Sequence, residues 1–175
     1  MREKLLSMML LAATAASAQQ GPLWMRYPAI SPDGKQIAFA YKGDLFCVDA
    51  NGGKARQLTT NPAYDYKPVW SPDGTKIAFA SNREGSFDVY VVDARGGEPS
   101  RLTTNSAGEI PVTWRDNSHI VFQSSVMPTA ESIIFAGSFV EEYEVDLDGH
   151  RPTLFSTLQM DDISINNRGE ILYHD

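Results

Sequence analysis

The sequence contains very little of the chemistry that builds disulfides or histidine-dependent active sites. Cys47 is the only cysteine in 175 residues, so no disulfide can form within the chain, and its apolar surroundings predict a small buried side chain. The histidines, His119, His150 and His174, stand far apart, and neither a Gly-x-Ser-x-Gly nor a His-Glu-x-x-His motif is present. We therefore expect no catalytic residue, no metal site and no cofactor in this chain.

Positive charge is also scarce. The chain has 15 lysines and arginines against 22 aspartates and glutamates, which gives a formal net charge of −7. Because an acidic surface repels the phosphate backbone, we expect no nucleic-acid partner. The hydrophobic fraction of 42% is ordinary for a globular protein, so the fold is expected to depend on packing alone.

Long hydrophobic runs are missing as well. The mostly apolar stretch from Leu5 to Ala16 is shorter than the roughly 20 residues that span a membrane. It follows the charged start Met1–Lys4 and ends in a small-residue motif that closes at Ala18. This order predicts that residues 1–18 are a secretory signal peptide cleaved after Ala18, which leaves a periplasmic or secreted chain without a membrane span. A retained N-terminal anchor is the alternative.

The chain repeats itself. Residues 31–40 are SPDGKQIAFA and residues 71–80 are SPDGTKIAFA, and the segments DLFCVDANGGKARQLTTN (44–61) and DVYVVDARGGEPSRLTTN (88–105) also correspond. A third copy is degraded, with residues 114–118 in place of the Trp-Ser-Pro-Asp-Gly turn, and a fourth starts at Asp161. Such a period indicates a repeat architecture.

Each copy has the pattern of short strands joined by tight turns. Ser-Pro-Asp-Gly favours a turn, and the alternating Ile-Ala-Phe-Ala that follows favours a strand with two differently packed faces. A β-branched and aromatic strand comes next, then a Gly-Gly turn and a fourth short strand over Arg56–Thr60 or Arg101–Thr104. No segment after the signal peptide has a helical period.

Four antiparallel strands per unit predict an all-β fold, an antiparallel β-propeller with four-stranded blades. About three and a half blades of a six- or seven-bladed ring are expected, over residues 23–61, 62–105, 106–158 and, incomplete, 159–175. Aromatic residues at equivalent places are expected to fill the layers between blades: Phe39 and Phe79, Phe46 and Tyr90, Trp70 and Trp114.

The alternation of strand direction separates two ends of each blade. The Ser-Pro-Asp-Gly and Gly-Gly turns emerge at one end, and Asp44, Asp49, Asp88 and Asp93 recur at strand ends, where hairpin hydrogen bonding is favoured over metal binding. The opposite end carries connections of variable length: 41–43, 61–66, 81–86, 105–109 and 124–137. Variable loops on a repeated scaffold are usual binding positions.

Six residues on that variable end are candidates for contact with a peptide or another domain: Tyr64, Tyr66, Arg83, Glu109, Glu131 and Phe135. The last two lie in the long third connection, whose apolar stretch 133–135 either extends a strand or covers a partner.

The repeated pattern resembles the propeller repeats of TolB and tricorn proteins. Residues 23–34, LWMRYPAISPDG, are more specifically similar to the propeller start of exported bacterial homologues of tricorn protease, and residues 61–65 and 171–175 support the same comparison. In that family a peptidase core with the catalytic residues follows the propeller.

The resemblance therefore implies a non-catalytic N-terminal propeller segment of an exported tricorn-like serine peptidase. Such a segment guides or gates peptides and contacts the later peptidase domains, so its partners are a peptide or protein substrate and those domains. The alternatives are a TolB-like periplasmic protein-binding scaffold and the propeller cap of a prolyl-oligopeptidase-like enzyme. Because the fourth copy ends after its second strand, we also expect the isolated chain to be an incomplete folding unit that aggregates, oligomerises or melts early.

Overall fold

The computed structural model describes residues 24–125, 140–156, 161–166 and 168–174. The predicted signal peptide, most of the long third connection, and with it Glu131 and Phe135, lie outside the described residues. Regular structure in the described ranges is all strand, and none of it is a helix that could cross a bilayer.

The strands form three four-stranded sheets and one two-stranded sheet. Sheet 1 contains β1 (Arg26–Ile30), β2 (Gln36–Tyr41), β3 (Asp44–Asp49) and β4 (Arg56–Gln57). Sheet 2 contains β5 (Asp65–Trp70), β6 (Lys76–Glu84), β7 (Ser86–Asp93) and β8 (Ser100–Arg101). Sheet 3 contains β9 (Glu109–Trp114), β10 (His119–Ser124), β11 (Glu141–Asp146) and β12 (Thr153–Ser156), and β13 (Asp161–Ile165) pairs with β14 (Ile171–His174).

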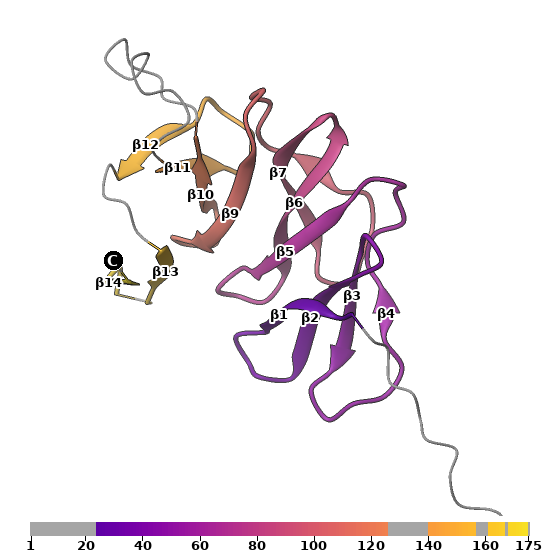
Figure 1. Cartoon of the computed structure of the whole chain (residues 1–175). Helices are drawn as coiled ribbons and strands as arrows, with labels where there is room; N and C mark the ends of the chain where they lie inside the picture. Colours follow the sequence, from indigo (N-terminus) through magenta and orange to yellow (C-terminus); the bar gives the residue numbers. More distant parts are fainter. Residues whose placement is uncertain (1–23, 126–139, 157–160, 167, 175) are drawn as a thin grey trace, which may run out of the picture.

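Within every sheet each strand pairs antiparallel with its neighbour in sequence. The sheets follow one another around an arc, and the first strands lie side by side on its concave side, β1 against β5, β5 against β9 and β9 against β13 (Figure 1). This arrangement confirms the predicted fold class, an all-β partial propeller built from four-stranded antiparallel blades.

The Ser-Pro-Asp-Gly segments form the same turn in sheets 1 and 2. The Ser31 hydroxyl donates to Asp33 Oδ1 at 2.7 Å, and the Gly34 amide donates to the Ser31 carbonyl at 2.9 Å. Gly34 has φ 72° and Gly74 has φ 69°, a left-handed conformation that glycine adopts at little cost. Sheet 3 has no glycine in this turn, and there Asp116 Oδ1 accepts from the Ser118 and His119 amides instead.

Alternation of large and small residues explains how the sheets stack. In sheet 2, Ile77 and Phe79 of β6 face sheet 1, whereas Ala78 faces sheet 3. Sheet 1 presents Ala38 and Ala40 to those large side chains, so that each interface joins a bulky face to a shallow one. Cys47 lies in the first of these interfaces and is 4% exposed, which confirms the buried position predicted for it.

Tryptophan side chains connect neighbouring sheets. The Trp70 indole N–H donates to the carbonyl of Ala29 on β1 at 3.0 Å, and Trp114 donates to the carbonyl of Val69 on β5 at 3.0 Å. Both rings are at least nine-tenths buried. The predicted inter-blade tryptophan layer is therefore confirmed, with a hydrogen bond in each layer that the sequence pattern did not reveal.

Two strand predictions were wrong. The fourth strands of sheets 1 and 2 are two residues long, because the hydroxyls of Thr59 and Thr103, rather than backbone carbonyls, accept from the Leu45 and Val89 amides. The segment 81–84 belongs to β6 rather than to a loop, because Ser81 pairs with Asp88 in the β6–β7 ladder.

Candidate functional site

The connections predicted to share one end of the blades meet in the structure. The Asp65 amide donates to the Gly43 carbonyl at 2.7 Å, and the Tyr64 amide donates to Asn82 Oδ1 at 2.7 Å. The Ser86 hydroxyl donates to the Asn105 carbonyl at 2.8 Å. We call this the loop end, and the opposite end with the Ser-Pro-Asp-Gly and Gly-Gly turns the turn end.

An aromatic cluster lies on the loop end between sheets 1 and 2. Tyr66 is at its centre, with its ring centroid 5.4 Å from Tyr27, 5.6 Å from Tyr64 and 4.9 Å from Phe87. Burial raises the pKa of the Tyr66 hydroxyl, and the neighbouring Tyr27 and Tyr64 raise it further. Since Tyr27 is 38% and Tyr64 39% exposed, the cluster offers both ring surface and hydroxyl groups to solvent.

Arg83 lies beneath this surface rather than on it. Its side chain is only 9% exposed and forms an ion pair with Asp65, with 2.8 Å between Nη2 and Oδ2. The guanidinium carbon also lies 5.6 Å from the ring centroid of Phe79 and 5.2 Å from that of Tyr90. These contacts fix Arg83 in place, so its part in the site is to hold the start of β5 against the end of β6.

Glu109 is the first residue of β9, as Asp65 is the first residue of β5, and it lies at the loop end between sheets 2 and 3. It is 3% exposed, and burial raises the pKa of its carboxyl group. Next to it, Asp88 is fully buried and pairs with Arg101 at 2.8 Å. Burial also raises the pKa of Asp88, while the charge of Arg101 opposes that rise.

The recurring aspartates divide into two kinds. Asp49 and Asp93 accept from the amides of Asn51 and Arg95, each at 2.8 Å, so they support their turns as predicted. The carboxylates of Asp44 and Asp88 do not support a turn in this way. They accept instead from residues of the fourth strands, Gln57 at 3.0 Å and Arg101 at 2.8 Å, because those side chains extend back across the sheet.

The first strands of the sheets line a cavity of about 360 Å³ on the concave side of the arc. Its described lining residues come from β1, β5, β9, β10 and β13: Tyr27, Pro28, Lys67, Pro68, Val69, Pro111, Val112, Gln123 and Ile163. We call it the inner-strand cavity. None of these residues was a candidate from the sequence, although the aligned pairs Tyr27-Pro28 and Lys67-Pro68 were a visible signal.

Two lining residues have an unusual backbone. Tyr27 has φ 53° and Lys67 has φ 50°, and each precedes a proline. A left-handed residue with a side chain costs roughly 1–3 kcal/mol, and a following proline disfavours the helical regions further. A shift in strand register accompanies each, between Arg26 and Ala29 in β1 and between Tyr66 and Val69 in β5. These are bulges, which typically re-aim a side chain.

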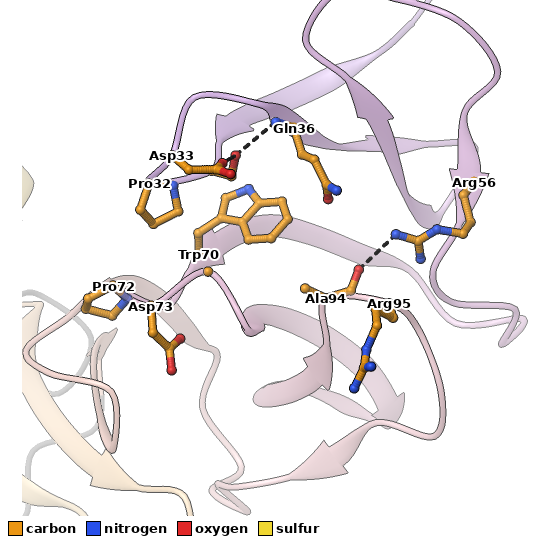
Figure 2. A pocket seen from close by; sticks show the side chains of 11 residues that line it. Pro32, Asp33, Gln36, Arg56, Trp70, Pro72, Asp73, Ala94 and Arg95 are labelled. Atoms are coloured by element: carbon orange, nitrogen blue, oxygen red, sulfur yellow. Dashed lines mark hydrogen bonds between the residues drawn. The ribbon is translucent and has the colours of Figure 1, made fainter.

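A second cavity, of about 440 Å³, lies at the turn end between sheets 1 and 2. Figure 2 shows the Trp70 indole at its centre, with Asp33 and Gln36 on one side and Ala94 on the other. The Arg56 Nη2 atom donates to the Ala94 carbonyl at 3.0 Å, a bond that Figure 2 marks with a dashed line. Asp73 Oδ1 accepts from the Ser71 hydroxyl at 2.7 Å. Because Arg56 joins sheet 1 to the end of β7 in sheet 2 and Asp73 bonds within its own turn, this cavity is best explained as a structural joint.

His119 and His150 lie in separate turns of sheet 3. His119 Nδ1 lies 2.9 Å from Asp116 Oδ1, and His150 Nδ1 lies 2.6 Å from Asp146 Oδ2. The bond to Asp146 raises the pKa of His150. Asp146, Asp148 and His150 are close enough to share an ion, but the last two are exposed and the Asp146 carboxylate already accepts from the Asp148 amide of the turn. This is the geometry of a capped hairpin.

The sequence and the fold have clear relatives. A segment of 44 residues is 48% identical to the Tol-Pal system protein TolB of Anaeromyxobacter dehalogenans, which covers 23% of this chain and 10% of that protein. The structure of a putative TolB from Agrobacterium tumefaciens superposes with a TM-score of 0.64 at 23% identity, over 80% of this chain and 52% of that one. A puromycin-hydrolysing peptidase from Mycobacterium tuberculosis gives a TM-score of 0.62 at 16% identity, over 89% and 28%.

These likenesses show the fold, and the chain spans about a tenth of the curated TolB proteins and about half of the Agrobacterium structure. A more specific match comes from one protein family. Residues 22–175 match the family described as the tricorn protease N-terminal beta propeller domain. That match covers nearly all of the chain, including every strand from β1 to β14. The chain therefore belongs to the tricorn protease N-terminal β-propeller domain family.

Proposed function

We propose that this chain is the non-catalytic propeller portion of an exported, tricorn-like serine peptidase, in which it guides or gates peptides and contacts the later peptidase domains. The observation that supports this most is the family match over residues 22–175. The fold likeness to a peptidase from Mycobacterium tuberculosis agrees with a propeller that accompanies a hydrolase.

The geometry of the described residues suits guidance better than cleavage. The two histidines with described side chains bond to an aspartate in their own turns, and Asp65 and Asp88 are held by arginines. The inner-strand cavity, by contrast, is lined mainly by prolines and aliphatic residues, as ligand cavities commonly are. An extended peptide passing the concave side of the arc would meet this cavity.

The candidate contact residues take different parts in this proposal. Tyr64 and Tyr66 present the aromatic cluster beside Tyr27, which also lines the inner-strand cavity. Arg83 and Glu109 are buried and would position the loop end from below. Glu131 and Phe135 stay predictions, because they lie outside the described residues.

The test uses the intact gene product that contains this chain. We expect it to hydrolyse fluorogenic peptides, and Tyr64→Ala to raise KM for long peptides while kcat and KM for a short blocked substrate stay unchanged. The short substrate is the internal control, because it has too few residues to reach the aromatic cluster and the catalytic site together. A gene product without peptide hydrolysis would overturn the proposal.

Export is tested separately by N-terminal sequencing of the protein from its native cells. We expect the first residue to be Gln19, since residues 1–18 have the order of a signal peptide. A cytosolic protein that retains Met1 would remove this part of the proposal.

A second candidate is a TolB-like protein-binding scaffold, favoured by the 44-residue match to TolB at 48% identity. It predicts stable protein complexes and no peptide cleavage. A prolyl-oligopeptidase-like enzyme capped by the propeller would cleave peptides, and is distinguished by a reactive serine within a Gly-x-Ser-x-Gly elbow.

A further inference from the structure

The inner-strand cavity contains a single formal charge among its described lining residues. That charge is Lys67, on β5, and the other lining side chains are a tyrosine, a glutamine, three prolines, two valines and an isoleucine. The cavity volume of about 360 Å³ lies within the usual range for sites that bind small ligands or short peptide segments.

Lys67 is half-buried, and no acidic residue among those with described side chains forms an ion pair with it. Of the lysines and arginines classed as partly buried in the described ranges, Arg83 pairs with Asp65, whereas Lys67 and Lys76 take part in no ion pair. Of these two lysines, Lys67 is the one that lines the inner-strand cavity. An ammonium group beside apolar walls interacts more strongly with an anion than one in open water, because the local dielectric constant is lower. The site therefore favours a negatively charged group.

The backbone holds this charge at one position of the arc. Lys67 is in the left-handed region at φ 50°, within the bulge of β5. The bulge changes the direction of the Lys67 side chain from the one it would have in a regular strand. In sheet 3 the residue aligned with Lys67 is Pro111, which is fully buried and carries no charge. The repeat does not require a lysine here, and its strained backbone is the kind found at functional sites.

We propose that Lys67 binds a carboxylate of a peptide in the inner-strand cavity, either the chain-terminal carboxylate or that of an acidic side chain. This inference rests on the proposed peptide-guiding function. A single ammonium matches a single carboxylate, whereas the formal net charge of −7 disfavours a polyanion. The prolines and valines around Lys67 would contact the apolar part of the same peptide.

The experiment measures binding rather than cleavage, on the intact gene product treated with a covalent serine-hydrolase inhibitor. Three peptides labelled with fluorescein at the N-terminus share neutral side chains. One has a free C-terminal carboxylate, one has a C-terminal amide, and one has the amide and an internal glutamate. Fluorescence anisotropy gives the dissociation constants for the wild type, Lys67→Gln, Lys67→Arg and the exposed control Lys54→Gln.

We expect the wild type to bind at least one carboxylate peptide about tenfold tighter than the neutral amide, the factor typical of one charge-assisted hydrogen bond. Lys67→Gln should abolish that preference, Lys67→Arg should keep most of it, and Lys54→Gln should leave it unchanged. Preference for the free C-terminus identifies the chain-terminal carboxylate, and preference for the glutamate peptide identifies the side chain. Acetate should compete with the preferred carboxylate peptide for the wild type, which tests for a carboxylate site without any variant.

The inference is overturned if the wild type does not distinguish carboxylate from amide, or if Lys67→Gln binds like Lys54→Gln. If the untreated gene product hydrolyses peptides normally, either result removes the proposed carboxylate site and leaves the peptidase assignment unchanged. Binding that depends on Lys67 in a protein without hydrolysis removes the peptidase assignment alone.

Discussion

Replacing Trp114 with phenylalanine should loosen the contact between sheets 2 and 3. The ring is 3% exposed and packs in the interface formed by Ala78, Val89 and Phe122 among others, and its N–H donates to the Val69 carbonyl at 3.0 Å. Phenylalanine keeps the aromatic contact but cannot donate, so the Val69 carbonyl loses its partner from the neighbouring sheet.

The expected loss is worked from two contributions. An unsatisfied buried carbonyl costs about 1–3 kcal/mol. Phenylalanine is about 40 Å³ smaller than tryptophan, which at ~24 cal/mol per Å³ of cavity adds about 1 kcal/mol. The free energy of opening between these sheets should therefore fall by about 2–4 kcal/mol, which corresponds to a roughly 30- to 1,000-fold loss of amide protection.

Native-state hydrogen exchange, measured by mass spectrometry on the intact gene product, reports this loss of amide protection in the peptides that cover β9 and β10. Trp24→Phe is the matched control, because Trp24 is 74% exposed and its replacement should change protection by less than ~0.5 kcal/mol. If Trp114→Phe and Trp24→Phe leave β9 equally protected, the indole hydrogen bond does not connect the sheets and the reasoning is refuted.

Three further outcomes are expected. Burial raises the pKa of Glu109 above its ordinary 4.5, so the folded state binds the proton more tightly than the unfolded state. Stability therefore falls as the pH rises from the ordinary pKa through the raised one. Glu109→Gln should raise the melting temperature at pH 7, and a gain that does not shrink towards pH 4.5 would contradict this. Gly74→Ala should cost about 1 kcal/mol at φ 69°, whereas Gly108→Ala, in open space, should change the melting temperature little. Residues 19–175 expressed alone should self-associate in sedimentation experiments, because large apolar side chains such as Leu172, 74% exposed, lie at the surface; a monomer at every concentration would oppose this expectation.

The fold was predictable because its signals are local. The Ser-Pro-Asp-Gly turns, the alternation of Ile77 to Ala80 and the Gly-Gly turns each specify a few residues of backbone, and the repeat specifies that the same unit stacks again. The short fourth strands were not predictable in the same way, because a threonine hydroxyl from the next residues competes with the ladder.

The site was less accessible to sequence reasoning because its partners come from different sheets. Arg83 and Glu109 have the charge of surface residues, and only the packing of β5 and β9 against the neighbouring sheets shows that both are buried. The bulge at Lys67 depends on how β5 lies beside β6, which periodicity does not encode. The aromatic character of Tyr64 and Tyr66 was evident, but their cluster with Tyr27 required the fold.

The central claim is that this propeller serves a serine peptidase without supplying its catalytic residues. The most direct measurement is to label the intact gene product with a fluorophosphonate probe that modifies activated serines, and to locate the modified residue by mass spectrometry. The account predicts one modified serine, outside residues 19–175, and loss of peptide hydrolysis in step with labelling. A modified serine within residues 19–175, or peptide hydrolysis that survives complete labelling, would contradict it.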